Sequence, residues 1–164
     1  MAISKGDSVE ICMQEEGFLG SFYEATFLCK TRNQKKLLVR YKTLMYEQDE
    51  DEKEYERIFE VDAIEPCWVR PSPPKILVSE FKLSEKVDAY DNEGWWEGII
   101  VKRHGFNNYS VYFETTNELK DFSSYELRVH QDYVDGVWIR PPTEPYSIYL
   151  DMKLDRLYRS LRRN

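Results

Sequence analysis

The sequence predicts an all-β chain that is built from two copies of one small unit and ends in a short helix. Three observations predict this fold class. The same series of motifs occurs twice, each copy consists of short runs rich in β-branched and aromatic residues, and turn-forming residues separate those runs. Of the 164 residues, 41% are hydrophobic and 15% aromatic, which is enough for one ordinary domain or two small ones with real cores.

The duplication can be followed along most of the chain. Offsets between the copies fall from 78 to 70 residues, as loop insertions in a diverged tandem repeat would produce. The segments that we match are 6–11 with 84–89, 15–17 with 91–94, 21–26 with 94–99, 38–41 with 110–113, and 68–71 with 138–141.

Each copy reads as a small all-β unit. The strands expected in the first copy are residues 8–12, 23–30, 37–42 and 57–61, and those in the second are 86–90, 95–102, 109–113 and 119–123. Units of this size close favourably as barrels, because closure removes exposed strand edges. We therefore expect one barrel in residues 1–74 and another in 75–145.

The connector and the tail differ from the two repeats. Proline-rich residues 71–74 predict a stiff linker that holds the two barrels in a fixed mutual pose. In the tail, residues 146–164, apolar side chains recur at helical spacing, which predicts an amphipathic helix over 150–161 that packs on a barrel. A helix that binds a partner is the alternative.

The charge of the chain indicates a basic partner. There are 30 Asp and Glu against 23 Lys and Arg, a net charge of -7, and residues 47–56 alone contribute -6. Such a balance disfavours bulk binding to nucleic-acid phosphate, although an acidic run of this kind is usually a solvated loop. No apolar run approaches the roughly 18 residues of a membrane span and the first residues lack a signal-peptide core, so we expect a soluble intracellular protein.

Neither the cysteines nor the histidines indicate catalysis or a metal. Cys12, Cys29 and Cys67 contain no CxxC pair, and His104 and His130 are isolated in the sequence. The sequence also lacks a nucleophile–base spacing and a phosphate-binding glycine loop. We therefore expect no enzyme activity, no metal and no cofactor.

The aromatic residues predict a cage for a cation in the second copy. Tyr90, Trp96 and Phe113 lie at strand ends beside turns, and residues that flank the turns at one end of a small barrel converge on one rim. Three converging rings attract an alkylated ammonium group, which loses its water more readily than plain lysine. The alternative is that these rings belong to the core, as most aromatic residues of small barrels do.

The first copy offers a corresponding set beside the acidic run. Phe22 and Tyr23 follow its turn, Tyr41 ends a strand, and Tyr46 leads into residues 47–56. A carboxylate at the edge of such a cage accepts the remaining N–H of a dimethylammonium group. Carboxylates along the run would also attract unmodified lysine and arginine residues of a basic peptide.

At these residues the sequence resembles the plant tandem Agenet modules of the Royal superfamily, which are relatives of Tudor domains. The resemblance covers about residues 4–142, and the segments that carry it are 6–10, 15–25 and 39–41 in the first copy and 87–91, 94–98, 109–113 and 127–130 in the second. It implies two five-stranded Tudor-like barrels in a nuclear chromatin reader. The similarity is to heterochromatin proteins, acting in gene silencing, that bind the histone H3 tail dimethylated at lysine nine with lysine four unmodified.

The resemblance also implies the residues of the site. Cage positions of the family fall on Tyr23 and Tyr41 in the first copy and on Tyr90, Trp96 and Phe113 in the second. The first copy has Cys12 where the second has Tyr90, so Tyr46 or Trp68 would complete its cage, with Phe22 nearby. We favour the first copy for the methyl-lysine, because the acidic run lies beside it. The acidic peptide-binding surface expected with it consists of Glu15, Glu16, Glu47, Asp49, Glu50, Asp51 and Glu52.

An RNA-associated or general protein-interaction module is the alternative function. Lys30, Arg32, Lys35 and Lys36 form a basic hairpin that could contact phosphate, together with Lys102, Arg103 and the arginines of the tail. The net charge argues against this reading. The partner that we expect is therefore a methylated histone H3 tail. We expect the module to be monomeric and to bind no membrane.

Overall fold

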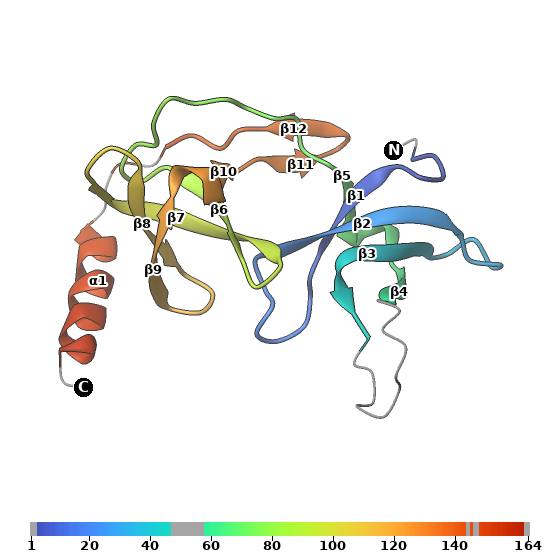
Figure 1. Ribbon diagram of the computed structural model, residues 1–164, viewed down its shortest axis with the longest axis horizontal. Helices are drawn as coiled ribbons and strands as arrows, with labels where there is room; N and C mark the ends of the chain where they lie inside the picture. Colours follow the sequence, from blue (N-terminus) through green and yellow to red (C-terminus); the bar gives the residue numbers. More distant parts are fainter. Residues whose placement is uncertain (1–2, 47–57, 144, 146–147, 163–164) are drawn as a thin grey trace.

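The computed structural model describes residues 3–46, 58–143, 145 and 148–162. Two curled antiparallel sheets lie side by side, and the C-terminal helix stands beside the second sheet on the side away from the first (Figure 1). The predicted fold class, an all-β chain of two tandem Tudor-like units with a short C-terminal helix, is confirmed.

The first sheet has the order β4-β3-β2-β1-β5. Its strands are β1 (Ser8–Cys12), β2 (Ser21–Lys30), β3 (Leu37–Met45), β4 (Phe59–Ile64) and β5 (Val69–Pro71), and a short 3-10 helix, η1 (Pro66–Trp68), joins the last two.

The second sheet repeats this topology in the order β9-β8-β7-β6-β10. Its strands are β6 (Lys86–Asp91), β7 (Gly94–His104), β8 (Asn108–Phe113), β9 (Glu118–Ser123) and β10 (Leu127–Val129), with η2 (Ser124–Glu126) before the last. A separate hairpin follows, formed by β11 (Asp132–Val134) and β12 (Val137–Ile139), and then α1 (Ile148–Leu161).

Two expectations need correction. Within the described residues no ladder joins β4 to β5 or β9 to β10, so the units are curled sheets rather than barrels closed by hydrogen bonds. The match of residues 68–71 with 138–141 is also wrong. β5 pairs with β1 and places Arg70 opposite Glu10, and the strand that pairs likewise with β6 is β10, which places Arg128 opposite Asp88.

Each sheet buries the side chains of its concave face. The buried core residues of the first unit are Val9, Ile11, Tyr23, Ala25, Phe27, Leu37, Val39, Tyr41 and Val69. In the second unit they include Val87, Ala89, Trp96, Ile100, Val111, Phe113 and Phe122. In β2 and β7 these are alternate residues, as expected for strands that present one face to a core.

Strong bending makes these small cores possible. A β-bulge interrupts β2 at Phe27 and Cys29, and another interrupts β7 at Ile100 and Lys102, which are the equivalent positions. Beside the second bulge the neighbouring strand approaches closely, since a Cβ atom added at Gly98 would lie 2.4 Å from Cγ1 of Val111.

The C-terminal helix covers the outside of the second sheet, as the apolar spacing of the tail predicts. Leu150 and Leu154 are buried against Val101 and Tyr112, and Leu157 packs beside them. Arginines of the helix remain exposed to solvent.

A short ladder joins the two sheets at the centre of the molecule. Ser21 of β2 pairs with Trp96 of β7, and Phe22 pairs with Trp95. Because Phe22 lies opposite Cys12 in the first sheet and Trp95 lies opposite Tyr90 in the second, Phe22 and Trp95 are equivalent residues that face each other. The two units are therefore related by an approximate two-fold axis through this pair.

Candidate functional site

The register of the strands identifies equivalent residues at the open ends of the two sheets. Tyr23 lies opposite Ile11, and its equivalent Trp96 lies opposite Ala89. Tyr41 lies opposite Ala25, and its equivalent Phe113 follows Tyr112, which lies opposite Ile99. All four rings are buried on the concave faces.

Charged residues of β4 line the end of the first sheet, and charged residues of β9 line the end of the second. In the first sheet, Arg40 pairs with Val61, so Tyr41 lies beside Glu60, and Val39 pairs with Asp62. In the second sheet, Phe113 pairs with Glu118 and Val111 pairs with Lys120. Glu60 is thus equivalent to Glu118, whereas Asp62 is equivalent to Lys120. The two ends have the same architecture but opposite charge at one position.

The end of the first sheet concentrates negative charge around a buried tyrosine. Burial, together with the carboxylates of Asp62, Glu60 and Glu15, raises the pKa of Tyr41 to about 12. Among the described residues, none of these three carboxylates forms an ion pair. The hydroxyl of Tyr41 donates a long hydrogen bond of 3.8 Å to the sulfur of Met13, a partly buried residue that packs against the core of the first unit.

Tyr23 faces the same end and contacts the second unit. Its hydroxyl donates to the backbone carbonyl of Asn92 at 2.8 Å, and a Cβ atom at Gly94 would lie 2.8 Å from its ring. Burial and the charges of Glu93 and Asp91 raise its pKa above the ordinary value. The β6–β7 turn therefore forms one wall of the first end.

The end of the second sheet contains a cavity of about 130 Å³, lined by Trp96, Phe113, Asp91, Asn92, Glu118, Lys120, Gly17 and Thr116. Its carboxylates are engaged by a lysine of the chain itself. Nζ of Lys120 lies 2.8 Å from Oδ2 of Asp91 and 3.8 Å from Oε2 of Glu118.

Phe18 connects the two ends and was not singled out from the sequence. Its ring lies 6.2 Å from that of Tyr23, edge to face, and is stacked at 6.1 Å on that of Trp96. It is 37% exposed, whereas Tyr23 and Trp96 are buried. The signal in the sequence was its place in the β1–β2 loop, three residues before the strand that carries Tyr23.

The other aromatic residues predicted for the first cage are Phe22, Tyr46 and Trp68. Phe22 points to the convex face, opposite to Tyr23, because side chains alternate along β2. Tyr46 is half-exposed, and its hydroxyl donates to the carbonyl of Val61 and accepts from its N–H. Trp68 is 40% exposed at the end of η1. Phe22 is thus separated from Tyr23 and Tyr41 by the strand itself, whereas a contribution of Tyr46 or Trp68 to the first cage stays a prediction.

The predicted trio of Tyr90, Trp96 and Phe113 is divided between the two faces of the second sheet. Tyr90 pairs with Trp95 and its ring packs on that indole at 5.1 Å, whereas Trp96 lies on the other face of β7. Only Trp96 and Phe113 of the predicted trio line the cavity.

The predicted acidic surface is described only in part. Glu15 and Glu16 are exposed on the β1–β2 loop. The remaining predicted members, Glu47, Asp49, Glu50, Asp51 and Glu52, lie outside the described residues. Glu60 and Asp62 are described, and they bring carboxylates to the first end directly.

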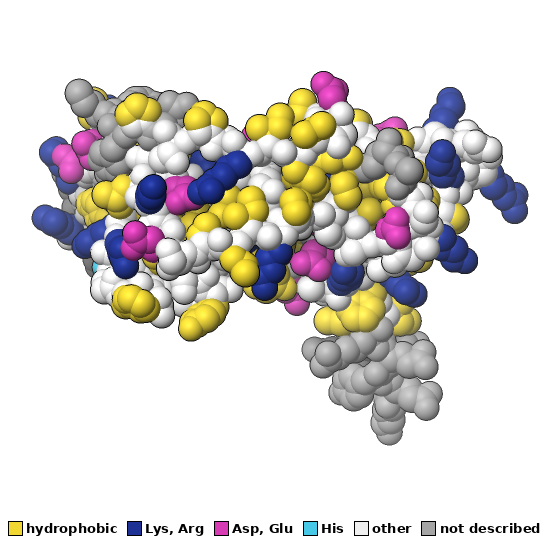
Figure 2. Space-filling view, turned by 90° about the horizontal axis from the view of Figure 1, so that it is seen from above, with side chains coloured by type: hydrophobic (Ala, Val, Ile, Leu, Met, Phe, Trp, Pro, Cys, Tyr) yellow, Lys and Arg dark blue, Asp and Glu magenta, His cyan; other side chains and the backbone are white. Residues whose placement is uncertain are grey.

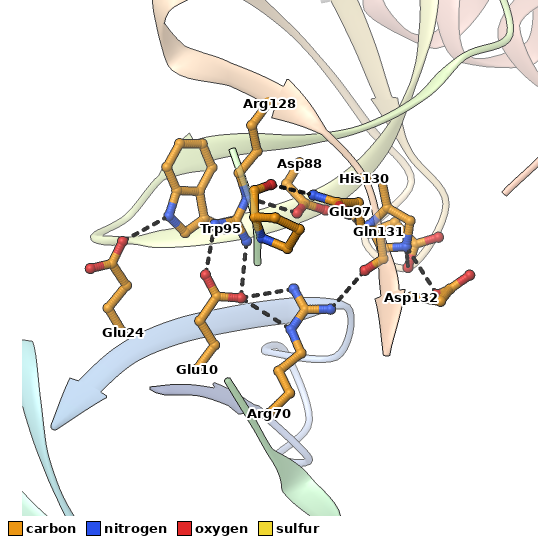
Figure 3. A network of polar contacts seen from close by, with 11 residues as sticks. Glu10, Glu24, Arg70, Asp88, Trp95, Glu97, Arg128, His130, Gln131 and Asp132 are labelled. Carbon is orange, nitrogen blue, oxygen red and sulfur yellow. Dashed lines mark hydrogen bonds and ion pairs between the residues drawn. The ribbon is translucent and has the colours of Figure 1, made fainter. Parts of the chain in front are cut away.

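A buried network of charges fixes the two units to each other (Figure 3). The Glu10 carboxylate accepts hydrogen bonds from Arg70 of its own unit at 2.8 and 3.1 Å and from Arg128 of the other unit at 2.6 and 3.0 Å. Arg128 also binds Asp88, which in turn binds His130 at 2.5 Å. Glu10, Asp88 and His130 are each 1% exposed.

The network follows the approximate two-fold axis. The Arg70 guanidinium lies 3.5 Å from the ring centroid of Phe22, and that of Arg128 lies 4.3 Å from that of Trp95. Equivalent arginines thus stack on equivalent rings while both bind Glu10. Since breaking a buried ion pair is costly, the network holds the two ends in a fixed mutual position.

Features typical of other kinds of site are not found in the described part of the chain. It has no group of three or more His, Cys, Asp and Glu side chains that could hold a metal ion. No helix in it has the length and apolar character that crossing a membrane requires.

Comparison with known proteins identifies relatives from Arabidopsis thaliana. The chain is 38% identical over 139 residues to Protein AGENET DOMAIN (AGD)-CONTAINING P1, covering 84% of this chain and 25% of that protein. It is 34% identical over 149 residues to DUF724 domain-containing protein 3, covering 88% of this chain and 20% of that protein. The chain thus spans a quarter or less of these relatives.

Solved structures resemble the fold over both units. The crystal structure of Arabidopsis thaliana AGDP1 AGD34 has a TM-score of 0.72 at 30% identity, covering 84% of this chain and 89% of that one. The crystal structure of ADCP1 tandem Agenet domain 3-4 has a TM-score of 0.69 at 27% identity, covering 85% and 88%. The family model described as Agenet domain matches residues 6–74 and again 84–145. The chain therefore belongs to the Agenet domain family and contains two Agenet domains in tandem.

Proposed function

We propose that this tandem Agenet module is a chromatin reader that binds the histone H3 tail dimethylated at lysine nine and unmodified at lysine four. Agenet domains are binding modules rather than enzymes, which supports a role in recognition. The proposal places the module in the nucleus, as a monomer that acts in heterochromatin and gene silencing.

The dimethylammonium group enters the end of the first sheet. The observation that carries this assignment is the register of β3 and β4, which brings Glu60 and Asp62 to Tyr41. Together with Glu15 these carboxylates raise the pKa of Tyr41, and none of them forms an ion pair among the described residues. A dimethylammonium group has one N–H, and a carboxylate accepts it in a charge-assisted hydrogen bond. The rings of Tyr23 and Tyr41, with Phe18 at the rim, supply the faces that attract the cation.

Met13 acts as the cover of this pocket. Its sulfur accepts the hydrogen bond from Tyr41, and Tyr41 is only 4% exposed, so the ligand displaces the methionine to reach the ring. Methionine suits this role because its flexible side chain adopts alternative positions at low cost. The freed Tyr41 hydroxyl then faces the ligand.

Calorimetric titration with three H3 peptides tests the proposal: unmodified, dimethylated at lysine nine, and dimethylated at both lysines four and nine. We expect the second to bind most tightly. Asp62→Asn removes a carboxylate at the first end and weakens the preference for methylation, whereas Glu126→Gln, on η2 of the second unit, leaves it unchanged. Equal affinity of the parent protein for all three peptides would refute the proposal.

A second candidate function rests on the β2–β3 turn. Lys30, Arg32 and Lys35 are exposed and form no ion pair among the described residues, and Lys and Arg side chains gather at this end of the molecule (Figure 2). Lys36 is partly neutralised by Glu65 at 3.6 Å. An RNA-associated module would bind single-stranded RNA with a steep dependence on salt and without a response to peptide methylation. Substituting the three residues by Ser would then abolish RNA binding.

A further inference from the structure

The second sheet reproduces the first pocket with one reversal of charge. Trp96 replaces Tyr23, Phe113 replaces Tyr41 and Glu118 replaces Glu60, so both ends have buried rings beside a carboxylate. At the position of Asp62 the second sheet carries Lys120. Asp91 supplies a further carboxylate at the second end, where the first sheet has Met13.

Lys120 occupies this end as a ligand would. Its ammonium lies 2.8 Å from Asp91 and 3.8 Å from Glu118, and these residues line the same cavity as Trp96 and Phe113. The hydrogen bond to Asp91 raises the pKa of Lys120 above the ordinary value, so its charged form is favoured. A lysine ammonium is therefore already held at the mouth of a pocket with aromatic walls.

Geometry also allows this lysine to leave. Its side chain is 40% exposed and stands on β9, the edge strand of the sheet. Exposed ion pairs are weak, so exchange of one ammonium for another requires no unfolding. A cavity of about 130 Å³ remains beside it, several times the roughly 30 Å³ that one water molecule occupies in the liquid.

We propose that the end of the second sheet is a second ammonium-binding pocket, occupied by the chain's own Lys120, and that a lysine side chain of a partner enters it by displacing Lys120. The ligand class is an alkylammonium that retains at least one N–H, because Asp91 and Glu118 are hydrogen-bond acceptors. The inference rests on the proposed function, since the first pocket is its template. Lys120 makes the tandem module bind predominantly at one end.

Lys120→Met tests the inference, because methionine keeps much of the length of the side chain and removes its charge. The probe is the amide of acetylated dimethyl-lysine, and the readout is the indole N–H signal of Trp96 in nitrogen–proton correlation spectra, assigned with Trp96→Phe. This indole donates to the carbonyl of Asp91 at 2.7 Å, so it reports on the second pocket. We expect the Trp96 signal of Lys120→Met to saturate at about fivefold lower probe concentration than that of the parent protein.

Lys102→Met is the matched control, since Lys102 is an exposed lysine of β7 that forms no ion pair among the described residues. It changes the net charge equally, and we expect it to behave as the parent protein does. The inference is overturned if Lys120→Met and Lys102→Met respond alike, or if Trp96 does not respond in Lys120→Met.

The backbone signals of Glu60 and Asp62 report separately on the first pocket. A Trp96 response in Lys120→Met without any change at Glu60 and Asp62 contradicts the proposed function and supports the second pocket. The reverse pattern supports the proposed function and contradicts the second pocket.

Discussion

Glu10→Gln is expected to destabilise the whole tandem module, because Glu10 joins the two units at their most buried charged contact. Its carboxylate is 1% exposed and accepts four hydrogen bonds from two arginines. Arg70 is itself 7% exposed and has no other carboxylate partner among the described residues. Glutamine keeps the shape but leaves this guanidinium without a hydrogen-bonded carboxylate.

The size of the effect follows from the burial. Removing one partner of a buried ion pair costs about 3–5 kcal/mol. In a chain of this length each kcal/mol lowers Tm by about 2–4 °C, so we expect a fall of about 6–20 °C. Thermal unfolding followed by circular dichroism at pH 7 measures it.

Two further variants make this measurement decisive. Glu80→Gln breaks the exposed pair between Glu80 and Arg103, whose side chains are 48% and 39% exposed, and it should cost no more than about 1 kcal/mol. The double variant Glu10→Gln/Arg70→Met removes the unpaired charge of Arg70 and should recover part of the lost stability. If Glu10→Gln lowers Tm no more than Glu80→Gln does, the network does not hold the units together.

Two other variants test the junction and the curvature of the sheets. Burial alone would lower the pKa of His130, but Asp88, Glu97 and Asp132 raise it above the unfolded value of about 6.5. The contribution of His130 to the free energy of unfolding is therefore fully present below about pH 6.5 and is lost as the pH rises through the pKa of the folded protein. Urea unfolding between pH 5 and pH 9 should show this decline in the parent protein and not in His130→Asn; equal pH profiles would contradict it. Gly98→Ala should lower Tm by about 2–12 °C, because overpacking against Val111 costs about 1–3 kcal/mol. Strand propensity alone would instead raise Tm, and a higher Tm would show that β7 and β8 do not approach so closely.

The fold could be predicted because the same pattern of strands and turns occurs in both copies of the repeat. Apolar alternation in β2 and β7 defines the same face in both copies, and the aligned strands place Tyr23 with Trp96 and Tyr41 with Phe113. Local similarity was misleading for the Trp-Val-Arg-Pro and Trp-Ile-Arg-Pro motifs, which are similar in sequence but do not occupy equivalent positions in the two units. Which of two arginines is equivalent to Arg70 depends on pairing with a distant strand, and β10 carries that arginine although it has no tryptophan.

The candidate site could be predicted only in outline. Phe22 and Tyr90 were grouped with the cage because they lie near strand ends. Since side chains alternate between the two faces of a strand, both lie on the face opposite to Tyr23 and Trp96. Glu60 and Asp62 were overlooked beside the denser charge of residues 47–56. Their relation to Tyr41 depends on the register between β3 and β4, which no local pattern specifies.

Contacts between residues that are distant in the sequence were the hardest to predict. Phe18 reads as an ordinary loop aromatic until the β2–β7 ladder brings Trp96 to it. Lys120 reads as a solvated strand lysine until the β8–β9 register places it beside Asp91. The contact of Phe18 arises from the docking of two folded units, and that of Lys120 arises from the strand register within the second unit; no local sequence pattern encodes either of them.

Mapping the bound dimethyl-lysine onto the chain decides whether the first pocket is the methyl-lysine site. Nitrogen–proton correlation spectra are recorded while the H3 peptide dimethylated at lysine nine is added, with the unmodified peptide as reference. If the first pocket holds the methyl-lysine, the changes specific to methylation are largest at Met13, Tyr41, Glu60 and Asp62. Methylation-specific changes centred instead on Trp96 and Phe113 in the parent protein, or none at either end, would contradict this assignment.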